Sequence, residues 1–313
     1  MKLKSLAIGK LQISDNVFLA PMAGYTDYAF RSLAVPLGYG LSFTELISAK
    51  GVCLGGKDNL ILAKTDDYKK TAVQIFGSDP YYMRKALESE TLKDYLIADI
   101  NMGCPVPKVF KNGEGSALLA DISRAENIIK ECVKSGKIIT VKIRTGLKRG
   151  DDIAAEFCRM AENAGASLIT VHGRVREDYY SGAPDFDAVY RAKKSVNIPI
   201  IANGGVFTEE DADEILEKTG ADGVMLARGG VANPFLVCEL LKVSSPFTLK
   251  EFMIKQIGKM KEIYPDRRAT VEFRKFVPYY FKGRKDVKSL KLALYGAENT
   301  DELLDIINSS DCF

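Results

Sequence analysis

The stretch YLIADINMGCPVP, residues 95–107, decides the fold prediction because an apolar run within it stops abruptly at a loop. Residues 95–100 are mostly apolar, as expected for a parallel strand that is buried on both faces. Gly103 and Pro105 prevent the strand from continuing. The loop would present Cys104 to a substrate, because function in α/β proteins usually resides in such loops. Taken alone, however, a free cysteine is more often a small buried hydrophobe.

Seven more apolar runs of this kind occur along the chain, at intervals that leave room for a helix. The eight strand candidates are residues 17–20, 41–44, 71–76, 95–100, 138–143, 167–171, 198–202 and 223–226. Amphipathic helical patterns fill most of the intervals, as at residues 123–135, 151–164 and 208–219. The last pattern opens on Thr208 with Asp211 three residues on, which is close to a capping box.

Eight βα units predict a TIM (β/α)8 barrel over residues 1–243. A doubly wound sheet would alternate in the same way, but the chain has no GxGxxG turn. After residue 243 the alternation stops, and residues 248–263, 267–282 and 286–308 show helical patterns. We therefore expect a small helical domain over residues 244–313, joined by a Ser-Ser-Pro linker.

The helical tail is basic although the whole chain is nearly neutral. The chain has 44 Lys and Arg against 41 Asp and Glu, whereas residues 242–291 hold 14 Lys or Arg and only 5 Asp or Glu. A basic segment on a mildly acidic body is a candidate contact for a phosphate backbone. The candidate residues are Arg267, Arg268, Arg274, Lys275, Lys282, Arg284 and Lys285. The alternative is a solvated helical face without a ligand.

Composition excludes several protein classes. The six cysteines form no CxxC pair, which argues against a zinc ribbon or a disulfide framework and favours a reducing cytoplasm; they are Cys53, Cys104, Cys132, Cys158, Cys238 and Cys312. No signal pattern and no apolar run near the roughly 18 residues of a membrane span occurs, so we expect a soluble cytoplasmic protein without membrane contact. His172 is the only histidine and lies near no carboxylate cluster at ligand spacing, so we expect no metal.

Polar and glycine residues follow most of the strand candidates, where a TIM barrel places its active site. In chain order they are Pro21, Met22, Ala23, Gln74, Asn101, Cys104, Lys142, Arg144, His172, Arg174, Asn203, Gly204, Gly205, Ala227 and Arg228. Polar side chains in barrel strands are costly unless they are satisfied. Their convergence on one mouth therefore predicts a bound polar ligand.

The glycine pairs after the last two strands lie where TIM barrels usually bind phosphate. Asn203 and Arg228 would add side-chain donors there. The glycines could instead only make tight turns, and a buried Lys142 could pair with a barrel carboxylate such as Glu45. A lone histidine is more often structural, but the place of His172 directly after a strand favours a hydrogen bond to the ligand.

Together these motifs closely resemble those of one family, the tRNA-dihydrouridine synthases, which are flavoenzymes that reduce a uracil of tRNA. The matching segments are APMAGYTDYAFR at 20–31, QIFGSDP at 74–80, DINMGCPVPKV at 99–109, GEGSALL at 113–119, VKIRTG at 141–146, VHGRVREDYYSG at 171–182, IPIIANGGV at 198–206 and GVMLARGGVANPF at 223–235. A shorter match, EFRKFVPYY at 272–280, resembles the family's helical RNA-binding domain. The combination is highly specific and spans nearly the whole predicted barrel.

The resemblance implies a role for each of the strand-end residues. FMN would contact Pro21, Met22, Ala23, Gln74, Lys142, His172, Asn203, Gly204, Gly205, Ala227 and Arg228. Cys104 would be the general acid, and the substrate would be held by Asn101, Arg144 and Arg174. The cation of Lys142 would stabilise negative charge at the N1/O2 edge of the reduced flavin.

Three positions depart from the family's pattern. Ala227 stands where glycine is usual, Phe186 where tryptophan is common, and Gly205 where aspartate is frequent. These departures concern the phosphate geometry rather than the reaction.

The implied reaction adds a hydride from reduced FMN to C6 of uracil and a proton from Cys104 to C5, on a base that has left its stack. It requires a protonated thiol, which burial would favour and nearby Lys108 would oppose. NADPH or NADH would supply the electrons in a ping-pong order. We expect a monomer that binds tRNA through the tail and the barrel mouth.

Two other functions fit part of the pattern. An FMN barrel acting on a free pyrimidine, similar to dihydroorotate dehydrogenases, would also use a strand-end lysine and a loop cysteine, but would leave the basic tail without purpose. An RNA-binding barrel that has lost catalysis would not need Cys104 and Lys142. Which tRNA uridine is modified cannot be read from the sequence.

Overall fold

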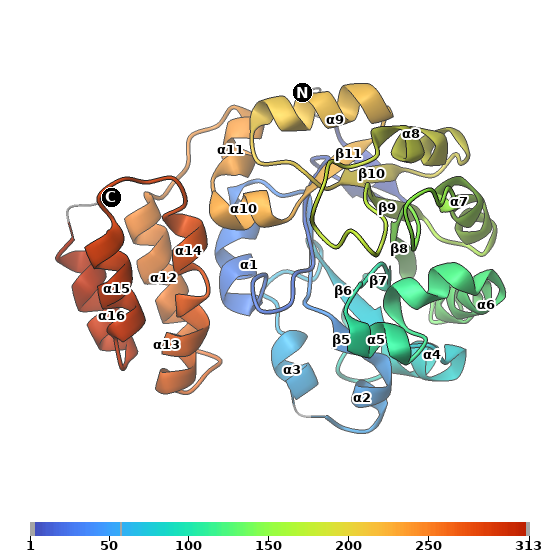
Figure 1. The fold of residues 1–313 in the computed structure, drawn as a ribbon. Helices are drawn as coiled ribbons and strands as arrows, with labels where there is room; N and C mark the ends of the chain where they lie inside the picture. The colour runs from blue at the N-terminus through green and yellow to red at the C-terminus, as the bar shows by residue number, and fades with distance from the viewer. Residues whose placement is uncertain (1–3, 57, 311–313) are drawn as a thin grey trace.

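Eight parallel strands close into a barrel (Figure 1). The computed structural model describes residues 4–56 and 58–310. The strands pair in the order β4-β3-β11-β10-β9-β8-β7-β6, and β4 also pairs with β6, which closes the ring. Their bounds are β3 Val17–Leu19, β4 Leu41–Phe43, β6 Thr71–Phe76, β7 Ile97–Met102, β8 Ile138–Arg144, β9 Leu168–His172, β10 Ile200–Asn203 and β11 Gly223–Leu226. The predicted TIM barrel is confirmed.

The strand predicted at residues 95–100 lies two residues further along the chain. The apolar pattern predicts residues 95–100, whereas β7 runs from Ile97 to Met102. Asn101 is therefore part of the strand and pairs with Lys142 of β8. The polar Asn101 side chain faces the barrel interior, where it finds partners, so a polar residue does not end the strand here. The loop begins at Gly103.

Helices surround the barrel and cover the outer faces of its strands (Figure 1). They are α1 Tyr28–Ala34, α2 Ala49–Cys53, α3 Asp58–Leu62, α4 Pro80–Leu87, α5 Pro107–Lys111, α6 Ile122–Val133, α7 Ala154–Asn163, α8 Phe186–Lys194, α9 Glu209–Thr219, α10 Arg228–Ala232 and α11 Leu236–Leu241, with short 3-10 turns η1 Val35–Leu37 and η2 Gly115–Ala120. In α6 the apolar stripe Ala125, Ile128, Ile129 and Cys132 is fully buried. The capping box of α9, between Thr208 and Asp211, is present as predicted.

Two small sheet elements lie outside the eight predicted strands. An antiparallel hairpin of β1 (Leu6–Ile8) and β2 (Leu11–Ile13) precedes the barrel, and β5 (Ile47–Ser48) pairs with β6. Ile8 and Ile13 of the hairpin cluster with inward-facing barrel residues such as Phe18. The hairpin thus closes the barrel at the end opposite to the strand termini that carry polar residues.

The tail after residue 243 is helical, as predicted, but contains more breaks. Its helices are α12 Leu249–Lys261, α13 Asp266–Arg274, α14 Val277–Tyr280, α15 Lys288–Gly296 and α16 Thr300–Asn308. The single helix predicted over residues 267–282 is wrong, because α13 ends at Arg274 and a new short helix begins at Val277, with Pro278 in its first turn. The one over 286–308 is also wrong: Ala297 is extended, and the side chain of Asn299 caps α16.

The tail packs against one side of the barrel through aromatic rings. In Figure 1 its helices lie beside α1, α10 and α11. Phe30 of α1 lies with its ring centroid 5.7 Å from Phe252 of α12 and 5.8 Å from Phe276, where the rings stack. These residues are fully buried. Within the described residues no helix is long and apolar enough to cross a membrane.

Candidate active site

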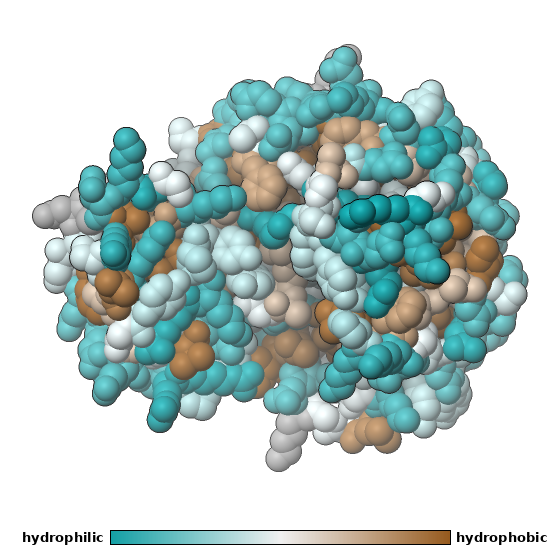
Figure 2. Space-filling model, in the orientation of Figure 1, coloured by the Kyte–Doolittle hydropathy of each residue, from teal (hydrophilic) through white to brown (hydrophobic). Residues whose placement is uncertain are grey.

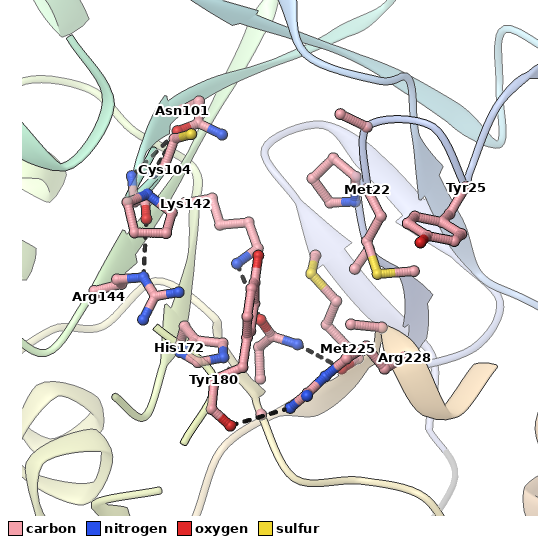
Figure 3. Close-up of a pocket in the computed structure, with 18 of the residues that line it drawn as sticks. Met22, Tyr25, Asn101, Cys104, Lys142, Arg144, His172, Tyr180, Met225 and Arg228 are labelled. Carbon is pink, nitrogen blue, oxygen red and sulfur yellow. Dashed lines mark hydrogen bonds between the residues drawn. The ribbon is translucent and has the colours of Figure 1, made fainter. Parts of the chain in front are cut away.

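A cavity of about 540 Å³ opens at the carboxyl ends of the barrel strands. Almost every strand-end residue named from the sequence lines it: Pro21, Met22, Ala23, Gln74, Asn101, Cys104, Lys142, Arg144, His172, Asn203, Gly204, Gly205, Ala227 and Arg228. Figure 3 shows Asn101, Cys104 and Lys142 on one wall and Met22 with Tyr25 on the wall opposite. The predicted polar residues therefore do converge on one mouth.

Strand register explains this convergence. Asn101 lies opposite Lys142, Arg144 lies opposite His172, and His172 lies opposite Asn203 across successive strand pairs. Side chains two residues apart face the same side of a strand, so the inward face of β8 carries Lys142 and Arg144 in succession. Apolar residues such as Ile97, Ile138 and Leu168 fill the barrel toward the start of the strands, and the polar residues lie toward the mouth.

Lys142 is a half-buried cation with an amide partner. Its Nζ donates to Oδ1 of Asn203 over 3.0 Å, and Nδ2 of Asn203 donates to the Met225 carbonyl over 2.8 Å. Burial, together with the nearby Arg144 cation, lowers the pKa of Lys142 to about 8. The suggested pairing of Lys142 with Glu45 is wrong, because Glu45 accepts a hydrogen bond from the Gly24 backbone N–H over 2.6 Å.

A chain of buried hydrogen bonds runs beneath the cavity. Thr140 Oγ1 donates to Oδ1 of Asp99 over 2.6 Å, and Gln74 Nε2 donates to Oδ2 over 2.7 Å. Asn101 Nδ2 donates to Gln74 Oε1 over 2.9 Å. Burial raises the pKa of Asp99 to about 6, against the lowering by these two donors and by the Lys142 cation. Nothing in the sequence reading singled out Asp99.

Cys104 sits in a loop that is held from two sides. Its backbone N–H donates to Oδ1 of Asn101 over 2.9 Å, and its carbonyl accepts from Oγ of Ser116 over 2.7 Å. Gly115 has φ +60°, and a Cβ added there would lie 2.9 Å from the Cys104 Cβ. The loop therefore rests directly on main chain, and only glycine fits behind it.

The Cys104 thiol is half-buried, and burial raises its pKa. A backbone hydrogen bond at Val106 and the cations of Arg144 and Lys142 act in the opposite direction. The sequence pointed to Lys108 as the opposing cation, but Lys108 is an exposed residue of α5. Burial is the largest of these influences, so the thiol form is favoured.

The two strand-end arginines hold loops. Arg144 donates from Nε to the Gly103 carbonyl over 2.9 Å, and from Nη1 to the carbonyls of Val175 and Tyr179 over 3.0 and 2.9 Å. It therefore links the Cys104 loop to the loop after β9 while lining the cavity. Arg174 binds the carbonyl of Gly182 over 2.7 Å and does not line the cavity. The structure thus does not bring Arg174 to the cavity wall.

His172 is buried, and its pKa lies well below the ordinary value, because of burial first and then the surrounding cations. Its imidazole is therefore neutral at physiological pH. Within the described part of the chain, His172 Nδ1 and Arg174 Nη1 are buried polar atoms without a hydrogen-bond partner. Both residues flank Gly204, where an added Cβ would lie 3.3 Å from Arg174 Nη1 and 3.3 Å from His172 Nε2.

The glycine turns after β10 and β11 pack closely together. Gly204 and Gly205 have φ values of +114° and +85°, which side chains rarely adopt. A Cβ on Gly229 would lie 2.1 Å from the Val206 carbonyl oxygen. These glycines therefore do form tight turns. Because they lack side chains, they also leave the adjoining part of the cavity open.

Sequence reasoning missed an aromatic rim around the mouth, formed by Tyr25, Tyr180, Phe207 and Tyr279, all of which line the cavity. Tyr180 and Phe207 are 54% and 37% exposed. The Arg228 guanidinium lies 4.9 Å from the Tyr180 ring and 5.8 Å from the Phe207 ring. Tyr25 and Tyr279 meet edge to face at 5.1 Å. Tyr25, Tyr180 and Tyr279 lie in quoted motifs, but no spacing signal marks the rim residues as neighbours.

The helical tail completes this rim. Tyr279 belongs to α14, and Nζ of Lys282 lies 5.1 Å from the Phe207 ring. Figure 2 shows the resulting hollow between the tail on the left and the barrel on the right, with apolar surface at its floor and hydrophilic groups along its sides. The barrel and the tail therefore form the cavity mouth together.

The basic residues of the tail differ in exposure. Arg267, Arg268, Lys275, Lys282, Arg284 and Lys285 are exposed. Arg274 is partly buried and donates to the Ala297 carbonyl, so it supports the joint between α15 and α16. Lys275 forms an ion pair with Glu272. The exposed members can contact an external anion.

No group of three or more metal-binding side chains occurs among residues 4–56 and 58–310. Five cysteines are free, namely Cys53, Cys104, Cys132, Cys158 and Cys238, and Cys312 lies outside the described residues. The chemistry available at the mouth is thus that of a thiol, a lysine, a neutral imidazole and oriented amides.

Comparison with known proteins gives a consistent result. A family model described as Dihydrouridine synthase (Dus) matches residues 18–308. The tRNA-dihydrouridine synthase B of Pasteurella multocida (strain Pm70) is 35% identical over 289 residues, which cover 89% of this chain and 87% of that protein. The tRNA-dihydrouridine synthase B of Proteus vulgaris is 32% identical over 315 residues, covering 97% of this chain and 98% of that protein.

Solved structures show likeness in fold. Histamine dehydrogenase from Rhizobium sp. 4-9 matches with a TM-score of 0.59 and 13% identity, covering 82% of this chain and 50% of that one. Morphinone reductase in complex with tetrahydroNAD matches with a TM-score of 0.57 and 11% identity, covering 77% of this chain and 90% of that one. At these identities the likeness concerns the barrel alone.

Proposed function

The chain belongs to the dihydrouridine synthase family and is an enzyme of the class that forms dihydrouridine in tRNA, and from this premise we propose that it works with FMN as cofactor and NADPH or NADH as the electron source. The observation that carries the proposal is the convergence of Cys104, Lys142 and Asn101 on one cavity. A thiol that keeps its proton, a half-buried cation and an oriented amide are what the reduction of a uracil ring needs.

The cavity has features that fit a flavin nucleotide. His172 lines the cavity, and its buried Nδ1 lacks a partner. A buried polar atom without a partner is costly unless a ligand satisfies it. Gly204 and Gly205 also line the cavity and leave that part of its wall free of side chains. The residues that would hold FMN are Pro21, Met22, Ala23, Gln74, Lys142, His172, Asn203, Gly204, Gly205, Ala227 and Arg228.

When bound, the reduced flavin supplies the hydride for C6 of the uracil, which no protein side chain can provide. Cys104 holds the proton at Sγ, because burial raises the pKa of the thiol, and delivers it to C5. Lys142 carries a positive charge below its pKa of about 8, where it counters negative charge on the ring system. Asn101 offers an amide N–H to the uracil edge, and Arg144 keeps the Cys104 loop in register with the loop after β9.

The aromatic rim fits the arrival of a uridine that has left its stack. Exposed rings such as Tyr180 and Phe207 can stack on bases, and the adjacent Arg228 and Lys282 can contact phosphates. We assign tRNA binding to this rim and to the exposed cations of the tail.

The proposed boundary between the barrel and the tail is at residues 243 and 244. It lies between α11, which ends at Leu241, and α12, which begins at Leu249.

The proposal is tested on the purified full chain. Bound flavin is released and identified by absorbance and mass spectrometry, and tRNA from a strain without dihydrouridine is then incubated with enzyme and either NADPH or NADH. Dihydrouridine found by nucleoside mass spectrometry is the expected result, and mass spectrometry of nuclease fragments of the same tRNA locates the position modified. Flavin-loaded enzyme that leaves this tRNA unchanged with both reductants would overturn the proposal.

The free-pyrimidine alternative is tested in the same preparation. The tail supplies Tyr279 to the mouth and Lys282 to its edge, which a small free base would not require. We therefore expect turnover on tRNA and none on orotate or free uracil. Turnover on orotate without turnover on tRNA would favour a dihydroorotate dehydrogenase-like activity.

A further inference from the structure

Asp99 ends the buried hydrogen-bond chain that starts at the Cys104 loop. It is fully buried, as are its partners Gln74 and Thr140. It faces the barrel interior one layer below Asn101 on the same strand, and it does not line the cavity. The mechanism proposed above gives it no role, yet a buried carboxylate carries a large desolvation cost that something must offset.

The backbone of the Cys104 loop determines which groups donate and which accept along this series of hydrogen bonds. The backbone N–H of Cys104 can only donate, so Asn101 must present its carbonyl oxygen to the loop. Its Nδ2 then points to Gln74, which must accept with Oε1 and therefore direct Nε2 toward residue 99. The group at position 99 must consequently be an acceptor.

A carboxylate meets this demand whichever way it is turned. Both of its oxygens accept, one from Gln74 and the other from Thr140. We propose that Asp99 is a positioning residue, whose acceptor oxygen orients Gln74 and through it Asn101, so that Asn101 holds the Cys104 backbone and turns an N–H toward the uracil. The link to uracil rests on the proposed function, whereas the link to the Cys104 loop does not. Figure 3 shows Asn101 directly beside Cys104 with its amide nitrogen directed into the cavity.

The alternative role for Asp99 is that of a countercharge to Lys142, because the two groups interact electrostatically. The two roles predict different orders of effect among substitutions. Asp99→Asn removes the charge but keeps an acceptor oxygen for Gln74, provided that its Nδ2 turns toward Thr140, whose hydroxyl can accept. Asp99→Leu has a similar size and removes both the charge and the acceptor.

Thr140→Val provides the matched control. With Asp99 present, losing the Thr140 hydroxyl leaves the Gln74 bond unchanged, because the carboxylate needs no orientation. With Asn at position 99, the same change removes the group that orients the amide and leaves its N–H buried without a partner. The two substitutions should therefore be non-additive in the double variant.

The experiment measures the alkylation rate of Cys104 by iodoacetamide in each full-length variant, with peptides separated by mass spectrometry so that the exposed Cys53 is not counted. We expect Asp99→Asn and Thr140→Val to stay within about threefold of the wild-type rate, and Asp99→Leu and the Asp99→Asn/Thr140→Val double variant to react about tenfold faster. Equal rates for Asp99→Asn and Asp99→Leu, or an additive double variant, would overturn the proposal. If Asp99→Leu does not fold, as judged by circular dichroism, the double variant alone carries the test.

Turnover separates this inference from the proposed function. In the variants whose Cys104 loop is labelled faster, we expect kcat for tRNA reduction, measured per flavin-loaded enzyme, to fall about tenfold or more. A wild-type enzyme that makes no dihydrouridine would refute the proposed function and leave the labelling result intact. Unchanged labelling in all four variants would refute the positioning role even in an active enzyme.

Discussion

The barrel mouth and the helical tail are both rich in cations, but they hold them in opposite ways. Arg144 at the mouth is buried and Lys142 is half-buried, and both are bound to fixed acceptors. Arg267 and Lys282 in the tail are exposed to solvent. A charge in a buried, preorganised site acts strongly at one point, whereas an exposed charge acts weakly and is screened by salt. The proposed function thus assigns the chemical step and the binding of RNA to different regions.

The largest expected effect is at the mouth. Replacing Cys104 with alanine removes the proposed proton donor, and we expect the rate of dihydrouridine formation to fall by about 10²- to 10⁴-fold. Flavin content and thermal stability should stay close to wild type. Nucleoside mass spectrometry of tRNA time courses measures the effect, with Cys53→Ala, an exposed thiol on α2, as the matched control. If the Cys104→Ala enzyme forms dihydrouridine as fast as the Cys53→Ala enzyme, Cys104 is not the proton donor.

The next effect is a pH dependence peculiar to the mouth. The pKa of Lys142 is lowered to about 8, so its positive charge is lost as the pH rises through that value. We expect kcat/KM for tRNA to be roughly tenfold lower one pH unit above that value than on the plateau below it. Lys142→Arg keeps the charge and should move the decline to higher pH. A wild-type profile that stays flat up to pH 10 would remove Lys142 from this role.

A graded effect is expected in the tail. Replacing Arg267 and Lys282 with alanine should weaken tRNA binding by about tenfold at low salt, and each substitution should reduce the slope of log affinity against log salt by about one. Lys130→Ala on α6, an exposed lysine far from the mouth, is the control. Binding is measured by filter retention at several salt concentrations. If the slope does not change, these cations do not contact phosphate.

The smallest expected effect lies where the two regions meet. Asp27 is 4% exposed and caps α1 by accepting from the Phe30 N–H, and burial raises its pKa to about 7. Between the ordinary value of 3.8 and about 7 the folded state holds this proton more tightly than the unfolded state. The free energy of unfolding therefore decreases as the pH rises through this window.

Asp27→Asn keeps a capping oxygen without this titration. We expect it to raise the free energy of unfolding by roughly 1 to 3 kcal/mol at pH 8, with a smaller gain at pH 5. Thermal melts at both pH values measure the difference. An equal gain at the two values would show that the burial of this carboxyl group is not the cause.

The barrel could be predicted because each of its parts leaves a local trace. Parallel strands buried on both faces produce apolar runs, and the polar exceptions, such as Asn101 and Lys142, lie near the strand ends that meet at the mouth. The strand-end residues of the sequence motifs therefore line the cavity. The shift of β7 shows the limit: Asn101 could not be recognised as a strand residue without knowing that Gln74 would bind it.

The remaining features depend on contacts between distant segments. Phe207 and Tyr279 form the rim only because the tail packs against α1, which no periodicity reveals. Arg174 turns toward the Gly182 carbonyl because the loop after β9 folds back on it. Asp99 reads in the sequence as one polar residue within an apolar strand, and its function follows only from the amides around it.

Gly115 gives the active site a fixed depth. A Cβ at position 115 would lie 2.9 Å from the Cys104 Cβ, so any side chain there would push the Cys104 loop toward the cavity. The space in front of the thiol therefore depends on a residue eleven positions further along the chain that does not itself line the cavity.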